Sequence, residues 1–409
     1  MPNAPLRYGR ALLPLWPLDP SIAYLNHGTV GATPHAVLAA QQALRDEIER
    51  QPARFLLREL TAIGQQGGRG GEGPPGEPRL RMRSAAAQVA PWLGVAGDDL
   101  VFVGNATAGA NAVLASFPLA PGDEVLVTNR TYGAVARAAA HHAARAGASV
   151  RTVDLPYPVS DAAPLVDAVA TALTPRTRLA VLDHISPETA LLMPLAEMAA
   201  ACRARGVAVL ADGAHAPGAV AVDIPALGVD FYTANLHKWA FAPRSSAVLW
   251  AAPRWRDRLH PPVISWGLGL GWHAEFDWIG THDPTPFLAA PAGWAFIDQA
   301  LGGREALWAR NHRLAWDTAL RLTERWGLPW TTPRAMVGSM VSLPLPPALG
   351  RGAAAAGALK DWLLYQRRIE AQILAIDDAL FWRLSAQAYV DDEDVERFTQ
   401  ALAAYPGAG

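Results

Sequence analysis

The stretch VAVLADGAHAPG, residues Val207–Gly218, decides the fold class: an apolar run ends at an aspartate, Asp212, and continues into a turn of small residues. Such a continuous apolar run is typical of a strand in a parallel sheet that helices cover on both faces. Ligands of these sheets bind outside the carboxyl ends of the strands. Asp212 is therefore a candidate site residue, although a metal, a ribose or a helix cap would use an aspartate there equally well.

A second stretch, TANLHKWAFAP, residues Thr233–Pro243, begins at the end of the next predicted strand and places Asn235, His237 and Lys238 in one loop. The chain has two lysines, Lys238 and Lys360, among 35 basic residues. Codon bias explains this preference for arginine, and a lysine that persists is favoured where arginine cannot serve. Arginine cannot lose its proton and attack a carbonyl. A surface lysine is the alternative, but the apolar residues that follow Lys238 disfavour it.

The sequence around these stretches alternates short apolar runs with alanine-rich helical patterns, which is typical of βαβ units and a mostly parallel sheet. We expect seven strands, at Leu100–Val103, Glu124–Thr128, Ser149–Val153, Leu179–Asp183, Val207–Ala211, Phe231–Ala234 and Ala247–Trp250. Helical sequence dominates from about residue 284, with short strands near Val337–Leu343 and Phe381–Ser385. The predicted fold class is α/β, with a large sheet domain and a smaller C-terminal α+β domain.

At 409 residues the chain exceeds one ordinary hydrophobic core, so we expect two domains. The predicted bounds are an N-terminal arm at residues 1–20, a large domain at 21–283 and a small domain at 284–409. Residues 64–78, GQQGGRGGEGPPGEP, hold seven Gly and three Pro, which neither a helix nor a strand tolerates. A flexible loop is therefore expected there.

The composition excludes several classes of protein. Hydrophobic residues make up 51% of the chain and charged residues 18%, which is too apolar for a disordered protein. A formal net charge of −2 lacks the strongly basic face that binds nucleic acid. The single cysteine, Cys202, rules out an internal disulfide and a cysteine-rich metal site, and we predict no metal. Since no apolar run reaches about 18 residues and the start lacks a basic-then-apolar pattern, we expect no membrane span, no signal peptide and a cytoplasmic location.

A strand-end aspartate followed by a strand-end lysine is what pyridoxal 5′-phosphate (PLP) chemistry needs. The lysine amine forms a Schiff base with the cofactor aldehyde, and the aspartate keeps the pyridine nitrogen protonated. The stretch VFVGNATAGAN, Val101–Asn111, offers N–H groups at a helix start for a phosphate. The stretch NRTYGA, Asn129–Ala134, offers Tyr132 as an aromatic face for the ring. Taken singly, the first could be mere packing and Tyr132 a core residue.

Together these stretches resemble the class V aminotransferase family of fold-type I PLP-dependent enzymes, and most closely its isopenicillin N epimerase-like branch. The resemblance covers most of the chain and includes three more motifs, YLNHGTVGATP (Tyr24–Pro34), WIGTHDP (Trp278–Pro284) and RLSAQAY (Arg383–Tyr389). It implies a fold-type I architecture, PLP as the cofactor, and a homodimer with shared active sites. The chain departs from the family pattern at residues 64–78, because members usually continue a helix there.

The resemblance also implies roles for the residues of the cofactor site. Lys238 carries the cofactor and moves the proton at the substrate α-carbon, Asp212 pairs with the pyridine nitrogen, and Tyr132 stacks on the ring. The phosphate is held by Ala106, Thr107, Asn235 and His237. The phenolic oxygen lies near His184 and His215. These last two could equally be buried, hydrogen-bonded histidines.

Three further residues are implied to act on the substrate or on the partner subunit. Arg383 grips the substrate carboxylate in a bidentate fork and is helped by Asn26. Thr281 reaches the phosphate of the partner subunit's cofactor, which implies the homodimer.

Lys238 must be neutral to attack, so we expect burial and the nearby cationic ring to lower its pKa.

The sequence leaves the reaction open. Persulfide-forming desulfuration needs a mobile, reactive cysteine, and Cys202, within the predicted helix Leu195–Arg205, is better interpreted as a small buried thiol. We favour a C–S lyase that expels the sulfur from an S-substituted cysteine conjugate in specialised metabolism. An epimerase, which needs a second acid or base, is the main alternative, and decarboxylation or transamination of a related conjugate is also open. The intact Lys238, Asp212 and Arg383 disfavour a scaffold protein that has lost catalysis.

Overall fold

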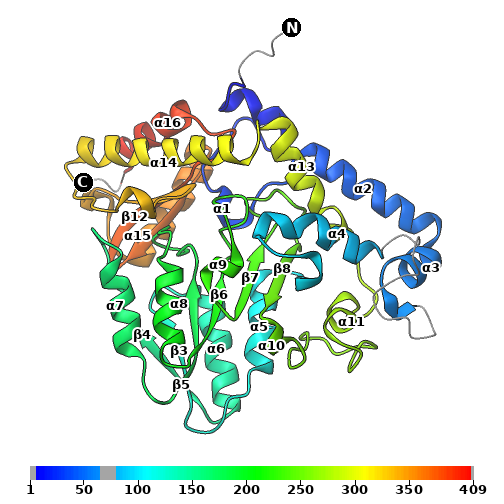
Figure 1. Cartoon of the computed structure of the whole chain (residues 1–409). Coiled ribbons are helices and arrows are strands. Elements are labelled where there is room, and N and C mark those ends of the chain that lie inside the picture. Colours follow the sequence, from blue (N-terminus) through cyan, green and yellow to red (C-terminus); the bar gives the residue numbers. More distant parts are fainter. Residues whose placement is uncertain (1–5, 65–79, 407–409) are drawn as a thin grey trace.

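The computed structural model describes residues 6–64 and 80–406, and it is built around a seven-stranded sheet (Figure 1). The strand order is β2-β8-β7-β6-β5-β3-β4, and β8 runs antiparallel to both of its neighbours while the other pairs are parallel. The strands are β2 (Leu100–Val103), β3 (Glu124–Thr128), β4 (Ser149–Val153), β5 (Thr177–Asp183), β6 (Ala208–Asp212), β7 (Phe231–Asn235) and β8 (Ala247–Ala251). The predicted mostly parallel α/β sheet is confirmed, and the strands differ from the prediction only at their ends.

Alternate side chains of the sheet enter two separate hydrophobic cores. Val125 and Val127 of β3 pack in one core with α5 (Ala106–Ser116) and α6 (Gly133–Arg145). Leu126, which lies between them, packs into the core on the opposite face. This alternation is the period of two that a strand imposes on its side chains. Both faces are therefore covered, which explains why the strands appear in the sequence as continuous apolar runs.

Further helices precede and flank the sheet. In chain order they are α1 (His27–Val30), α2 (His35–Arg50), α3 (Pro52–Arg54), α4 (Arg81–Val89), α7 (Ala163–Ala172), α8 (Leu195–Arg203), α9 (Ile224–Leu227), α10 (Pro253–Arg256), α11 (Trp272–Asp277), α12 (Thr285–Leu288) and α13 (Ala290–Ala300). Short 3-10 or π helices are η1 (Arg10–Leu15), η2 (Phe55–Glu59), η3 (Ala62–Gly64), η4 (Ala90–Leu93), η5 (Gly97–Asp99), η6 (Arg334–Met336) and η7 (Pro347–Leu349). The predicted loop at residues 64–78 lies outside the described residues apart from its first glycine. Within the described ranges, no helix is long and apolar enough to cross a membrane.

The C-terminal part of the chain packs helices against a separate three-stranded antiparallel sheet (Figure 1). Its order is β11-β12-β9, with β9 (Met340–Pro344), β11 (Gln372–Ile376) and β12 (Ala379–Ser385). The accompanying helices are α14 (Arg304–Trp326), α15 (Gly352–Arg367) and α16 (Asp392–Ala403), of which α14 packs on β9 and α15 on β11. Strand β11 and helices α15 and α16 go beyond the predicted elements. The predicted division between residues 283 and 284 stays a prediction.

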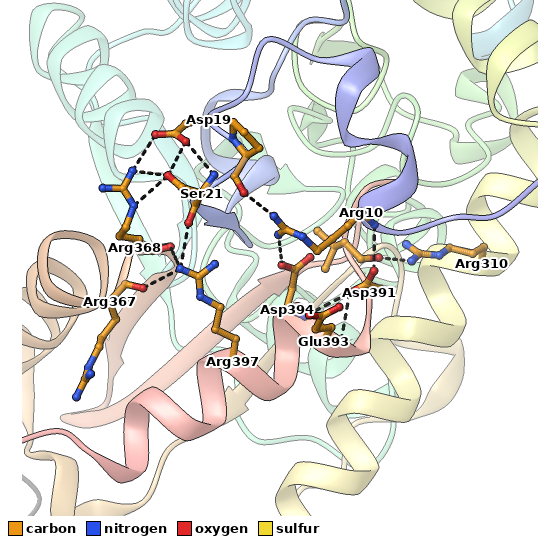
Figure 2. A network of polar contacts seen from close by, with 12 residues as sticks. Arg10, Asp19, Ser21, Arg310, Arg367, Arg368, Asp391, Glu393, Asp394 and Arg397 are labelled. Carbon is orange, nitrogen blue, oxygen red and sulfur yellow. Dashed lines mark hydrogen bonds and ion pairs between the residues drawn. The ribbon is translucent and has the colours of Figure 1, made fainter.

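The N-terminal segment lies on this C-terminal part. Strand β1 (Ala23–Tyr24) pairs in parallel with β10 (Ile369–Glu370). Figure 2 shows the polar contacts beside this pair, among them an ion pair of 2.7 Å between Arg10 and Asp394. Arg397 of α16 donates to backbone carbonyls on both sides, those of Ser21, Arg367 and Arg368. The segment is therefore held in place before it continues into α1.

Candidate active site

One pocket gathers most of the predicted site residues at the carboxyl ends of β5, β6 and β7. Its volume is about 230 Å³, whereas a single water needs about 10–15 Å³. It is lined by Thr29, Asn105, Ala106, Thr107, Tyr132, Asp183, Ile185, Pro187, Asp212, Ala214, His215, Asn235, His237 and Lys238. Segments that are far apart in the sequence meet here because parallel strands bring the loops that follow them to one edge of the sheet.

The Lys238 side chain enters the pocket from the loop that follows β7. Its Nζ lies 3.2 Å from Nε2 of His215. Burial, reinforced by the positive charge of Arg383, lowers the pKa of Lys238 to about 7, and the negative charge of Asp212 opposes this shift. A much larger share of the amine is therefore neutral near pH 7 than in a free lysine. The shift has the direction that an amine needs in order to attack a carbonyl.

Two buried carboxyl groups, Asp183 and Asp212, end adjacent parallel strands in direct register. Oδ1 of Asp212 accepts the N–H of Ala214 at 2.9 Å, and the backbone N–H of Tyr132 favours the charged form of Asp183. Burial raises the pKa of both carboxyl groups, and the charge of Asp212 raises the pKa of Asp183 further. Asp183 lines the pocket although it was not a predicted site residue. Its signal in the sequence equals that of Asp212, an aspartate that ends a continuous apolar run.

The start of α5 offers an N–H group to a ligand. Asn105 caps the helix by accepting the N–H of Ala108 at 2.8 Å, and Oδ1 of Asn235 accepts the N–H of Ala106 at 2.8 Å. Between them, the N–H of Thr107 has no acceptor among the described residues. Free N–H groups and the helix dipole favour an anion at such a position. Thr107 is thus the open backbone donor, because the N–H of Ala106 is already bonded to Oδ1 of Asn235.

Three predicted aromatic residues take different places. Nδ1 of His237 donates to the Ser246 carbonyl at 3.0 Å, so Nε2 is the ring nitrogen that a ligand in the pocket can reach. Tyr132 lines the pocket and is 48% exposed. His184 does not line it: its Nδ1 lies 2.8 Å from the hydroxyl of Tyr232 in the core. The alternative interpretation, a buried hydrogen-bonded histidine, fits the position of His184.

The Arg383 guanidinium of β12 is buried beside the pocket. It donates to the Pro187 carbonyl and, at 2.7 Å, to Oγ1 of Thr29, while its Nε has no partner among the described residues. Burial lowers the pKa of Arg383 to about 10. Asn26, predicted to help Arg383, lies behind Thr29, and its Oδ1 accepts a hydrogen bond from the Thr29 hydroxyl at 2.5 Å. Thr29, which was not predicted, therefore lines the pocket where Asn26 was expected.

Two further predictions concern residues away from the pocket. Thr281 is exposed and does not line the pocket of its own chain, so its contact with a partner's cofactor stays a prediction. Cys202 is fully buried in α8, and burial raises the pKa of its thiol to about 12. Such a thiol is a poor nucleophile, in agreement with a structural role. Within residues 6–64 and 80–406, no cluster of three or more His, Cys, Asp or Glu side chains could hold a metal ion.

Comparisons of the sequence with known proteins agree with the predicted family. The model of the class V aminotransferase family matches residues 60–268. The putative L-cysteine desulfhydrase 1 of Oryza sativa subsp. japonica is 35% identical over 421 residues, covering 94% of this chain and 83% of the relative. The isopenicillin N epimerase of Streptomyces clavuligerus is 32% identical over 408 residues, covering 95% of this chain and 96% of the relative.

Solved structures share the fold. A variant of C-DES with glycine covalently linked to its PLP cofactor matches with a TM-score of 0.74 at 23% identity, over 94% of this chain and 97% of that one. The cysteine desulfurase of Thermococcus onnurineus NA1 matches with a TM-score of 0.75 at 19% identity, over 98% of both chains. The predicted fold-type I architecture is therefore confirmed. With its motifs, its sheet and its relatives in agreement, the chain belongs to the class V aminotransferase family.

Proposed function

We propose that this chain is a PLP-dependent C–S lyase that acts on cysteine or on an S-substituted cysteine. The observation that carries the proposal is the Lys238 amine, which lies in a pocket with Asp212 and has a pKa lowered to about 7. An amine and a carboxyl group in this arrangement are the two protein groups that PLP chemistry requires. A relative that aligns over 94% of the chain is named a putative L-cysteine desulfhydrase, which supports the choice of reaction.

The donors at the pocket fit this cofactor. Two buried nitrogens, Nδ1 of His215 and Nε of Arg383, have no hydrogen-bond partner in the part of the chain that the structure describes. Buried polar groups are nearly always paired, so these nitrogens favour a ligand with several acceptor oxygens. The N–H of Thr107 adds a donor suited to a phosphate. A phosphate, a phenolic oxygen and a substrate carboxylate together supply the missing acceptors.

We assign the roles of the residues on this basis. When bound, PLP supplies an electron sink for negative charge at the substrate α-carbon. Lys238 holds the cofactor and moves the proton at that carbon, and Asp212 keeps the pyridine nitrogen protonated. Arg383 binds the substrate carboxylate with its free Nε and an adjacent N–H. The remaining cofactor contacts are Tyr132 on the ring, Ala106, Thr107, Asn235 and His237 around the phosphate, and His215 near the phenolic oxygen.

The proposed reaction balances without an oxidant or a reductant. Cα gives its proton to Lys238, and the Cβ–S bond breaks with its electron pair leaving on sulfur. The sulfur takes up a proton and departs as a thiol, or as hydrogen sulfide from cysteine itself. Water converts the remaining fragment to pyruvate and ammonia. Cys202 is too deeply buried to accept sulfur as a persulfide.

Epimerisation is the second candidate, and one observation favours it. Inverting Cα requires an acid or base besides Lys238, and the Asp183 carboxyl lines the same pocket with a raised pKa, which burial causes first and the charge of Asp212 second. A perturbed carboxyl group in a pocket is a candidate for proton transfer. The isopenicillin N epimerase of Streptomyces clavuligerus is the relative that supports this reaction.

We also propose that two copies of the chain pair. The segment between α10 and α11 exposes large apolar side chains, those of Val263, Ile264, Trp266, Leu268 and Leu270. Trp266 is 82% exposed, and exposed large apolar side chains gathered in one segment are typical of an interaction site. We propose that a second copy binds this surface, in a dimer in which Thr281 reaches the partner's cofactor. The predicted cytoplasmic location also stays a proposal, and one relative from Arabidopsis thaliana is named as chloroplastic.

Borohydride reduction followed by peptide mapping tests the cofactor assignment. The reduced adduct is expected on Lys238, and Lys238→Arg is expected to yield folded protein without the adduct and without visible absorbance. Lys360→Arg, which changes the other lysine of the chain, is the matched control and is expected to keep both signals. An adduct on Lys360, or none on the wild-type protein, contradicts the proposal.

Product analysis separates the two candidate reactions. With cysteine or an S-substituted cysteine, a lyase releases pyruvate and the sulfur compound in equal amounts. In heavy water, an epimerase places deuterium on Cα and inverts the configuration without releasing pyruvate. Deuterium uptake without elimination across a panel of such substrates would replace the lyase by the epimerase.

A further inference from the structure

A buried histidine, His27, touches the backbone of Lys238 and the C-terminal part of the chain at once. His27 is the first residue of α1 and is 0% exposed. Its Nε2 lies 3.0 Å from the carbonyl oxygen of Lys238, and its Nδ1 lies 2.8 Å from the hydroxyl of Tyr389. Tyr389 follows β12, the strand that carries Arg383. His27 therefore links the loop of the amine to the segment that follows the proposed carboxylate-binding arginine.

The chemistry of the two partners fixes the direction of both hydrogen bonds. A backbone carbonyl can only accept, so Nε2 of His27 carries the proton and donates to Lys238. Nδ1 of the neutral ring then accepts, and the Tyr389 hydroxyl donates to it. Burial lowers the pKa of His27 to about 4 and holds the pKa of Tyr389 well above its usual value. His27 therefore stays neutral and Tyr389 stays protonated, so both hydrogen bonds keep these directions throughout the physiological range of pH.

Packing holds the His27 ring against the lysine loop. The centroid of the ring lies 5.2 Å from that of Trp239 and 5.4 Å from that of Phe241, the residues on either side of the turn after Lys238. Phe241 has a φ of 58°, in the left-handed region that a non-glycine residue rarely adopts. A Cβ atom at Gly31 would meet the His237 carbonyl at 2.0 Å, so α1 ends directly against the backbone of the loop.

We propose that His27 is a positioning residue for Lys238: it fixes the Lys238 carbonyl relative to Tyr389 and so aims the amine into the pocket. This inference rests on the proposed function, in which Lys238 carries the cofactor. A displacement of about 1 Å at a reacting group costs up to about 100-fold in rate. Removing the hydrogen bonds of His27 to Lys238 and Tyr389 is therefore expected to lower kcat far more than it raises KM.

Three substitutions test this role, two at His27 and one at Tyr389. Tyr389→Phe removes the hydroxyl and keeps the ring, His27→Leu removes both hydrogen bonds, and His27→Gln restores an amide donor for the Lys238 carbonyl. We expect kcat to fall by about 10- to 100-fold in His27→Leu, with KM within about threefold, partial recovery in His27→Gln, and an intermediate loss in Tyr389→Phe. His35→Leu, at an exposed histidine, is the control and is expected to match the wild type.

A second measurement needs no cofactor. In a Lys360→Arg background, trinitrobenzene sulfonate labels the Lys238 amine and the N-terminal amine of the apoprotein, and the pH dependence of labelling on the peptide that contains Lys238 gives the pKa of that side chain. A loosened loop admits water to the amine, so its pKa is expected to rise from about 7 toward 10.5 in His27→Leu and in Tyr389→Phe.

The outcomes separate this inference from the proposed function. A wild-type protein without a borohydride adduct on Lys238 overturns the proposed function. With that adduct present, unchanged kcat and unchanged labelling in Tyr389→Phe and His27→Leu overturn the positioning role, and so does a lower melting temperature without a change in labelling. If His27→Leu does not fold, Tyr389→Phe and His27→Gln decide by the same two measurements.

Discussion

At the scale of single residues, burial and charge compete in the pocket. The opposite charges of Lys238 and Asp212 attract, yet burial moves the pKa of each toward the value that favours its neutral form. The neutral amine is the reactive one, so burial prepares Lys238 for attack. The same burial leaves Asp183 and Asp212 as two carboxyl groups that cannot both hold a charge without cost.

The pKa of Lys238 predicts how the stability of the apoprotein depends on pH. The native pKa, about 7, lies below the value of 10.5 for a free lysine, so the native state binds fewer protons than the unfolded chain between these values. The free energy of unfolding is therefore expected to gain a contribution from Lys238 as pH rises through this window. Urea unfolding at several pH values measures it, with Lys238→Met as the variant that lacks the contribution. Equal slopes in the two proteins would refute the shift.

The carboxyl pair predicts that Asp183→Asn stabilises the apoprotein at neutral pH. The pKa of Asp183 is raised above that of an unfolded aspartate, by burial first and by the charge of Asp212 second, so ionisation of Asp183 disfavours the native state. This cost is absent below about pH 3.9 and grows as pH rises toward the native pKa. Asparagine keeps the size and one side-chain oxygen of aspartate and carries no charge. The midpoint of urea unfolding should rise for Asp183→Asn at pH 7 and stay unchanged at pH 3, and a lower midpoint at pH 7 would contradict the prediction.

The sequence predicted some residues of the pocket and not others for a physical reason. Asp212 and Lys238 could be found because the apolar run before each of them encodes a strand end. Asp183 carries the same signal, but its role depends on β5 lying beside β6, which spacing along the chain does not tell. Thr29 and His27 lie on a short helix whose contact with the lysine loop arises only from tertiary packing.

At the scale of secondary-structure elements, a buried ion pair joins α4 to α11. Arg83 and Asp277 meet at 2.5 Å with side chains only 3% and 5% exposed, and Arg83 also donates to the Leu100 carbonyl at 2.7 Å. This second bond fixes the pair to the edge strand β2. The two helices and the strand therefore depend on one guanidinium group.

Replacing that guanidinium is expected to destabilise the fold. Arg83→Ala leaves Asp277 buried without its partner, which costs about 3–5 kcal/mol of unfolding free energy. Arg45→Ala is the matched control, because Arg45 and Asp283 form an exposed pair at 3.1 Å with side chains 47% and 46% exposed. An exposed pair contributes about 0–1 kcal/mol. Urea unfolding compares the two variants, and a similar small loss for both would show that the buried pair is dispensable.

Elements with a strong internal pattern were predicted, and elements defined by their partners were not. The strands of the large sheet were found because most of them are nearly continuous apolar runs. Strands β1 and β10 have two residues each, so they carry no period and exist through their mutual pairing. Sequence periodicity cannot detect an element of that length.

At the scale of the whole molecule, the exposed apolar segment predicts how the chain assembles. Trp266→Asp combined with Leu270→Asp places charges on the proposed contact, where burial without a partner is costly. Light scattering is expected to give about twice 43.5 kDa for the wild type and about 43.5 kDa for the double variant. Tyr365→Asp, at another large side chain that is 73% exposed, should leave the mass unchanged. A monomeric wild-type protein would exclude the shared site.

The pairing of β1 with β10 constrains the order in which parts of the protein can fold during translation. The ribosome releases β1 early, yet β10 and the segment that carries Tyr389 are translated only after all seven strands of the large sheet. Closing so long a loop costs little more entropy than closing a moderate one, so the delay is a matter of time rather than of free energy. A nascent chain that stops before residue 369 lacks both β10 and Tyr389. In such a chain β1 has no partner strand, and His27, which contacts the lysine loop, lacks its hydrogen bond with Tyr389.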